Sequence, residues 1–162
     1  IQRGRMEEEL REIALERDDV IRDRFDKLVA DGGILDLPDS ITASEMFRQA
    51  AEHLAPRVGT QATVLWDKFL RREAVGSTQL QPGLAIPHVI IDGHELFDVM
   101  LVRCKGGIYF GSDEPPVTTV FILVGSADER NYHLRALMAV ATIVQDLLSL
   151  LAYFGIATLI LL

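Results

Sequence analysis

The chain has 162 residues, enough for one domain with its own hydrophobic core. Apolar residues make up 49% and charged residues 25% of it, which is typical of a globular protein. The formal net charge of −8 argues against nucleic acid as a partner, because a phosphate backbone requires a basic surface. Cys104 is the single cysteine, so we expect no internal disulfide, no cysteine metal site and a reducing, cytoplasmic setting.

The first segment is rich in charge and predicts an amphipathic helix. Over residues 5–31, apolar residues recur at spacings of three and four, with acids and bases between them, and Gly32-Gly33 ends the pattern. We therefore divide the chain into an N-terminal helix, residues 1–33, and a domain, residues 34–162. The helix pattern is compatible with packing on the domain, with a link to a larger protein and with a homodimer formed through this helix.

Two more helices are predicted after a short connector, or strand, at residues 34–39. Thr42-Ala43-Ser44-Glu45 has the form of a capping box and is followed by an apolar face as far as Leu54. A further apolar stripe covers residues 61–73. Arg72 lies in the last turn of this helix, where positive charge suits the helix dipole.

The middle of the chain changes to a pattern of loops and strands. Residues 74–87 are rich in Gly, Ser, Thr, Gln and Pro and predict an exposed loop. Apolar segments then predict three strands, at residues 89–91, 96–104 and 117–124. Turns are expected between them at Gly106-Gly107 and at residues 112–116.

The last part of the chain predicts helix again. Ser126-Ala127-Asp128-Glu129 is a second capping box, expected to open a long helix that continues to about Val144. The uncharged segment Leu147–Leu162 is short for a membrane span, and we expect a buried helix or strand there. Helices, then strands, then helices predict an α/β sandwich with a central mixed β-sheet flanked by helices.

Among the four histidines, His88 stands out by its position. It follows Pro87 directly, at the end of the polar loop and the start of an apolar strand. Proline fixes its own φ and restricts the residue before it, so the His88 ring is held where the backbone has little freedom. A neutral imidazole nitrogen can attack a phosphoryl group without a separate base. His88 is therefore a candidate nucleophile.

The surrounding residues resemble a known family. Arg72-Glu73, Gly76-Ser77-Thr78 and Gly83-Leu84-Ala85-Ile86-Pro87-His88 together are similar to the active-site segment of the type-2 EIIA domains of the phosphotransferase system (PTS). This family contains mannitol, fructose and nitrogen-regulatory members. The resemblance covers roughly residues 34–146. It implies that His88 accepts a phosphoryl group from the phosphohistidine of an HPr-like carrier protein and passes it to a IIB domain in sugar uptake.

The resemblance also implies roles for four other residues. Arg72 stands where the family has an active-site arginine, whose guanidinium fork can stabilise a phosphoryl group in transfer. His133 stands where sugar-transporting members have a second histidine, which can donate to a phosphate oxygen. Ser77 and Thr78 are expected to add hydrogen bonds in binding. No cofactor is implied, because donor and acceptor are both protein side chains.

A cluster of acidic residues and histidine offers a rival to this interpretation. Together with His88 it would supply the oxygen and nitrogen ligands of a metal site, but its spacing matches no known helical metal motif, so we expect no metal. Glu95 and Asp98 are expected to be solvated instead. The cluster consists of Asp92, His94, Glu95 and Asp98.

Two functions remain open from the sequence. The first is the phosphocarrier that serves a IIB domain. The second is a regulatory EIIA-like domain, of the nitrogen-regulatory type or as the cytoplasmic appendage of a transporter, that docks partners according to its phosphorylation state. In the second case the domain is cytoplasmic but tethered to the inner membrane as part of a larger transporter.

Overall fold

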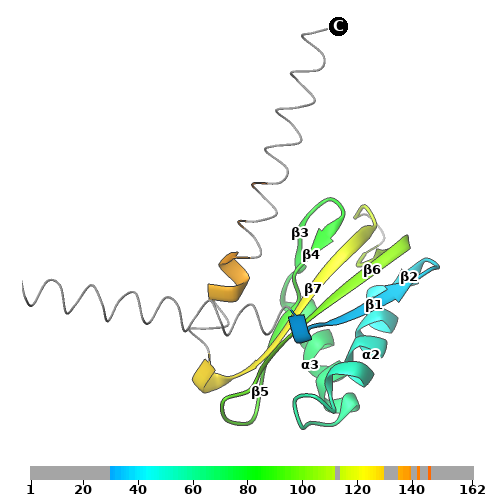
Figure 1. Cartoon of the computed structure of the whole chain (residues 1–162). Helices are drawn as coiled ribbons and strands as arrows, with labels where there is room; N and C mark the ends of the chain where they lie inside the picture. Colours follow the sequence, from blue (N-terminus) through cyan, green and yellow to red (C-terminus); the bar gives the residue numbers. More distant parts are fainter. Residues whose placement is uncertain (1–29, 112–113, 130–134, 140–141, 143–145, 147–162) are drawn as a thin grey trace, which may run out of the picture.

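The computed structural model describes residues 30–111, 114–129, 135–139, 142 and 146 (Figure 1). Three predictions therefore lie wholly or almost wholly outside the described residues: the helix over residues 5–31, of which only 30 and 31 are described, the position of His133 and the segment Leu147–Leu162. The division of the chain at residue 33 stays a prediction for the same reason. Within the described part of the chain, no helix is both long and apolar enough to cross a membrane.

A mixed sheet forms the centre of the domain (Figure 1). Its strands lie in the order β1-β6-β7-β4-β3, with β2 also paired to β6 and β5 to β7. β6 and β7 are antiparallel to each other, whereas β1 and β2 are parallel to β6, and β4 and β5 are parallel to β7. The strands are β1 (Gly33–Leu37), β2 (Ile41–Thr42), β3 (Gln79–Gln81), β4 (Leu84–Ala85), β5 (His88–Ile91), β6 (Phe97–Tyr109) and β7 (Val117–Ser126).

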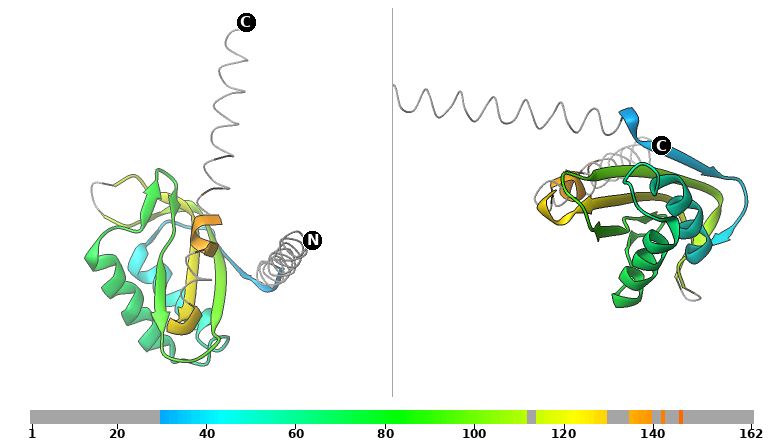
Figure 2. Two further views of the ribbon diagram at one scale, coloured as in Figure 1. Left: turned by 90° about the vertical axis from the view of Figure 1, so that its left-hand side faces the viewer. Right: turned by 90° about the horizontal axis from the view of Figure 1, so that it is seen from below.

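Helices α2 (Ala43–Leu54) and α3 (Ala62–Val75) cover one face of this sheet, and the helical residues 135–139 lie on the opposite face (Figure 2). The predicted sandwich of a mixed sheet flanked by helices is thus confirmed. α2 begins where the capping box predicts, since the Thr42 hydroxyl accepts a hydrogen bond from the Glu45 N–H at 3.3 Å.

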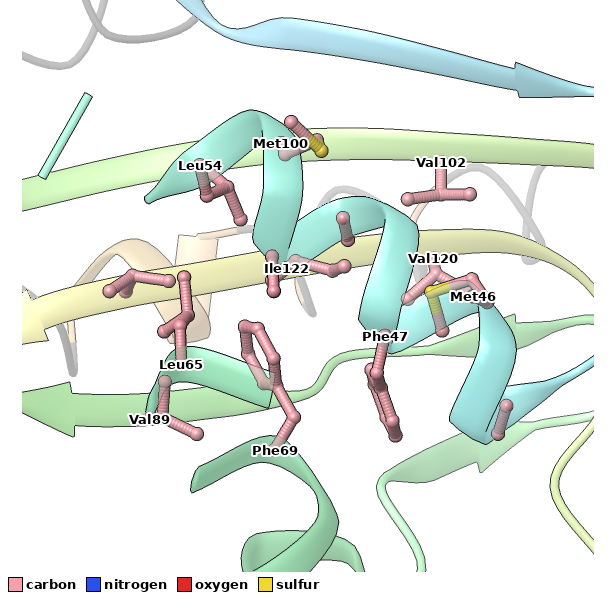
Figure 3. Close-up of a cluster of buried hydrophobic side chains, with 14 of the residues drawn as sticks. Met46, Phe47, Leu54, Leu65, Phe69, Val89, Met100, Val102, Val120 and Ile122 are labelled. Atoms are coloured by element: carbon pink, nitrogen blue, oxygen red, sulfur yellow. The ribbon is translucent and has the colours of Figure 1, made fainter. Parts of the chain in front are cut away.

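Alternation along the two central strands explains why both faces are covered. On β7, Val120, Ile122 and Val124 point into the main core with α2 and α3, while Leu123 joins a second cluster with Ala136 on the other face. The main core is built around Phe47 and Phe69, whose rings stack at 5.3 Å (Figure 3). Strands buried on both faces read as continuous apolar runs, and the central part of β7 has this character.

The segment predicted as an exposed loop, residues 74–87, is more ordered and more buried than expected. It contains the short antiparallel pair β3 and β4, which turns at Gly83 with φ of 84°. Pro87 is buried, and its carbonyl accepts a hydrogen bond from the Leu123 N–H of β7 at 3.0 Å. The polar composition concealed this pairing because the strands are only two and three residues long.

The turn predicted at Gly106-Gly107 is wrong, because both glycines lie within β6. A Cβ on Gly106 would lie 2.1 Å from the Ser40 backbone nitrogen, so only glycine allows the chain to cross here. Gly107 has φ of 88° where the register to β7 shifts, which is the geometry of a bulge. The glycines therefore permit a close backbone approach and a bend rather than the end of a strand.

The second capping box does not open a helix at Ser126. Ser126 is the last residue of β7, and its hydroxyl accepts from the Leu96 N–H at 3.0 Å. A short 3₁₀ turn, Ala127–Glu129, follows. The Asp128 carboxylate accepts from the Glu95 N–H at 2.8 Å, so these polar side chains close the β5–β6 connection instead of capping a helix.

Candidate functional site

A pocket of about 350 Å³ opens beside the start of β5. Its lining includes four of the five predicted site residues, namely Arg72, Ser77, Thr78 and His88. Arg72 comes from the last turn of α3, Ser77 and Thr78 from the segment that follows it, and His88 from the first position of β5. The fifth, His133, lies outside the described residues.

The His88 ring is held by a local hydrogen bond. Its Nδ1 lies 3.1 Å from the Ile86 carbonyl oxygen. Because a carbonyl oxygen only accepts, Nδ1 carries the proton and Nε2 carries the lone pair of the neutral ring. The buried Pro87 separates the two residues and fixes the backbone between them. This contact favours the tautomer with the proton on Nδ1 and the lone pair on Nε2.

The backbone of Ile86 is held in turn by hydrogen bonds that involve Thr78 and Glu73. The Ile86 N–H donates to the Thr78 carbonyl at 2.9 Å. Thr78 is only 7% exposed, and both of its donors bind the Glu73 carboxylate: the N–H at 3.0 and 3.2 Å to the two oxygens, and the hydroxyl at 2.6 Å. Thr78 thus has its donors fully used within the protein.

Arg72 and Ser77 are placed differently from Thr78. The Arg72 guanidinium donates to the Gly76 carbonyl at 3.0 Å, which uses one of its five N–H groups. The Ser77 hydroxyl is exposed and donates to the Glu114 carboxylate at 3.3 Å. A guanidinium that retains further donors suits an anion in the pocket, and an exposed hydroxyl can turn toward one.

The rim of the pocket is apolar and exposed. Leu80 is 54% exposed and Met138 is 69% exposed, and both line the same pocket as His88. Met138 belongs to the helical residues 135–139, so the second face of the sandwich contributes one wall of the site. A partner that brings its own reactive group to His88 would therefore meet methyl and thioether groups around it.

Members of the acidic cluster considered as a metal site contact different partners in the structure. Asp98 is 5% exposed rather than solvated as predicted, and it forms an ion pair with Arg57 at 2.7 Å. His94 contacts Asp128 at 3.2 Å. In the described part of the chain, His, Cys, Asp and Glu side chains form no group of three or more that could hold a metal ion.

Sequence reasoning did not assign roles to Glu73 and Gln79. Glu73 was noted only as the neighbour of Arg72, yet its carboxylate organises the floor of the site. Its position was a usable signal, since an acid in the last turn of a helix is disfavoured by the dipole and calls for another explanation. Gln79 lines the pocket and donates to the Pro115 carbonyl at 3.3 Å, a contact that no sequence pattern reveals.

The fold is that of the IIA domains of the phosphotransferase system. The chain belongs to the family described as "Phosphoenolpyruvate-dependent sugar phosphotransferase system, EIIA 2", whose model matches residues 34–149. The resemblance drawn from the sequence is thereby confirmed. Among solved structures, the nitrogen regulatory protein IIA-Ntr from Neisseria meningitidis superposes with a TM-score of 0.61 at 25% identity, covering 67% of this chain and 75% of that one. IIA mannitol from Escherichia coli, at 21% identity and a TM-score of 0.54, shares the fold.

The curated relatives are nitrogen regulatory proteins. That of Klebsiella oxytoca is 33% identical over 98 residues, which are 59% of this chain and 60% of the relative. That of Bradyrhizobium diazoefficiens is 29% identical over 120 residues, which are 74% of this chain and 78% of the relative. The match to the Klebsiella protein thus spans less than two thirds of its length.

Proposed function

We propose that this chain is a regulatory phosphoacceptor of the phosphotransferase system, in which Nε2 of His88 takes a phosphoryl group from the phosphohistidine of an HPr-like protein. The observation that carries the proposal is the hydrogen bond from His88 Nδ1 to the Ile86 carbonyl, at 3.1 Å, inside a pocket that Arg72 also lines. The donated proton leaves the lone pair on Nε2.

The transfer requires no cofactor and balances within the two proteins. The N–P bond of the donor phosphohistidine breaks as the Nε2–P bond of His88 forms, and the electron pair of the broken bond returns to the donor ring. Positive charge develops on the His88 ring, and the Ile86 carbonyl at Nδ1 stabilises it. The transferring group carries negative charge spread over three oxygens, which suits the Arg72 guanidinium and the Ser77 hydroxyl.

The proposal assigns supporting roles to two further residues. Thr78, whose donors bind Glu73, contributes the shape of the pocket floor rather than a hydrogen bond to phosphate. His133 is proposed as a second donor to the phosphoryl group, on the family resemblance alone. His133→Ala should then slow phosphorylation, and an unchanged rate would remove this residue from the proposal.

The regulatory role is favoured over sugar uptake by the relatives. The curated relatives and the Neisseria structure are all named nitrogen regulatory proteins. In this role the phosphorylation state of His88 controls which partner docks. The second candidate, onward transfer to a IIB domain, is supported by the description of the family model, which names a sugar phosphotransferase system.

Incubation with phosphoenolpyruvate, enzyme I and HPr tests the phosphoacceptor role, and the later addition of IIB domains distinguishes a sugar carrier from a regulatory protein. The proposal predicts one acid-labile phosphoryl group per chain, lost in His88→Gln and retained in the control His53→Gln, since His53 is exposed on α2. Absence of labelling with the cognate donor would contradict the phosphoacceptor role. Rapid discharge of the labelled protein by added IIB domains would favour the sugar carrier over the regulatory role.

A further inference from the structure

Glu73 lies at an unusual place for an acid. It is in the last turn of α3, where the helix dipole disfavours negative charge. Yet both of its carboxylate oxygens accept from Thr78, at 2.6 to 3.2 Å, so this charge is held by three contacts to one nearly buried residue. A side chain placed against the local preference and fully engaged is expected to serve a site.

The hydrogen bonds continue from Thr78 to the nucleophile. The Thr78 carbonyl accepts from Ile86 N–H at 2.9 Å, and the Ile86 carbonyl accepts from His88 Nδ1 at 3.1 Å. Glu73 is therefore connected to His88 by hydrogen bonds through two intermediate residues. None of these bonds joins the Glu73 and His88 side chains directly. We call this series, from Glu73 through Thr78 and Ile86 to His88, the Glu73–His88 path.

We propose that Glu73 is a positioning residue that fixes the tautomer of His88 through the Glu73–His88 path. The role rests on the proposed function, in which Nε2 is the nucleophile. Glu73 holds Thr78 in place, and Thr78 in turn fixes the position of Ile86. The Ile86 carbonyl then lies within hydrogen-bond distance of Nδ1 and keeps the ring proton there. The coupling is geometric, because each hydrogen bond fixes the position of the next residue along the path.

The variants follow from the geometry of the carboxylate. Glu73→Ala removes all three contacts to Thr78. Glu73→Gln keeps the shape and one acceptor oxygen, but its amide nitrogen cannot accept. Thr78→Val removes only the hydroxyl contact. The matched control is Asp67→Asn on the same helix, because Asp67 is exposed and pairs with the exposed Arg71 at 2.6 Å.

The first readout does not depend on phosphorylation. Long-range ¹⁵N–¹H spectra of the unphosphorylated full chain at about pH 8 report which ring nitrogen of each histidine carries the proton. The His88 signal is assigned by its loss in His88→Gln. We expect His88 in the wild type to be mainly the Nδ1–H tautomer. In Glu73→Ala the Nε2–H tautomer should gain population, in Glu73→Gln and Thr78→Val less so, and in Asp67→Asn not at all.

The second readout is the rate of labelling by phospho-HPr. We expect Glu73→Ala to be slower by about tenfold, which corresponds to about 1.4 kcal/mol in the barrier to transfer, with Asp67→Asn unchanged. If the wild type is not labelled, the proposed function fails, and the tautomer alone decides the role of Glu73. If Glu73→Ala does not fold, Glu73→Gln and Thr78→Val decide it. A His88 tautomer that stays at the wild-type ratio in the folded Glu73 variants would overturn the inference.

Discussion

Replacing Arg57 by methionine should destabilise the domain strongly, because it leaves a buried carboxylate without its partner. Arg57 binds both oxygens of Asp98, with Nε at 2.7 Å and a terminal nitrogen at 2.8 Å. The Asp98 side chain is 7% exposed and that of Arg57 is 32% exposed. The guanidinium also donates to the Asp31 carbonyl at 2.8 Å, which joins the entry to β1 to this pair.

The magnitude follows from this burial. Breaking a buried ion pair from one side costs about 3–5 kcal/mol, and the third of Arg57 that water reaches lowers the expected loss to about 2–3 kcal/mol. The control Arg103→Met removes a pair of the same chemistry, with Asp36 at 2.7 Å, but both of its side chains are more than half exposed. The control should lose less than about 1 kcal/mol.

The pH dependence gives a second check on the same variant. Burial raises the pKa of Asp98 above its ordinary value of 3.8, and Arg57 opposes that rise. A raised folded-state pKa means that the folded protein binds more protons than the unfolded chain just above pH 3.8, so the charged form costs stability as pH rises. Without Arg57 the pKa rises further, and the defect of Arg57→Met should shrink as pH falls toward that pKa.

Urea unfolding followed by circular dichroism, at about pH 7 and about pH 5, measures both effects. The double variant Arg57→Met with Asp98→Asn should recover part of the loss, because it removes the uncompensated charge. An Arg57→Met variant that loses no more than Arg103→Met, or whose loss is the same at both pH values, would refute the argument that Asp98 is buried and charged.

Three other predictions concern the core, the sheet and the site. Phe69→Ala should cost about 3–5 kcal/mol in urea unfolding, since Phe69 is fully buried against Phe47, and a loss below about 1 kcal/mol would mean that the stack does not form. Gly106→Ala should prevent the close crossing at Ser40 and lower the melting temperature by several degrees, and an unchanged value would contradict that contact. Arg72→Lys should slow labelling by about tenfold or more with stability unchanged, because lysine keeps the charge but not the fork, and a wild-type rate would remove Arg72 from the mechanism.

The positions of α2 and α3 could be predicted because their signals are local. The Thr42 cap and the apolar faces locate α2 and α3 within one or two residues. The errors have a different origin. Gly106 allows the backbone of Ser40, distant in sequence, to approach β6 closely, and the Ser126 hydroxyl accepts from the N–H of Leu96, which is also distant in sequence. Contacts between distant residues decide such positions, and a local pattern does not contain them.

The candidate site shows the same division. His88 and Arg72 could be proposed from the Pro-His context and the family resemblance, and they do line one pocket. The Glu73–His88 path could not be predicted from the sequence, even though all its residues lie within one short segment. It depends on the conformation of the loop after α3, which brings Thr78 next to Ile86. Met138 lies exposed on the rim of the pocket, in a part of the chain for which the sequence predicted only a helix.

The most direct test of the central claim is the position of the phosphorus after reaction with phospho-HPr. Phosphorus and nitrogen NMR of the labelled full chain identifies both the histidine and the ring nitrogen that carry the group. The account predicts a single phosphohistidine at His88, bonded through Nε2, with the proton on Nδ1 still donated to Ile86. Phosphorus on Nδ1 of His88, or on His53, His94 or His133, would contradict it.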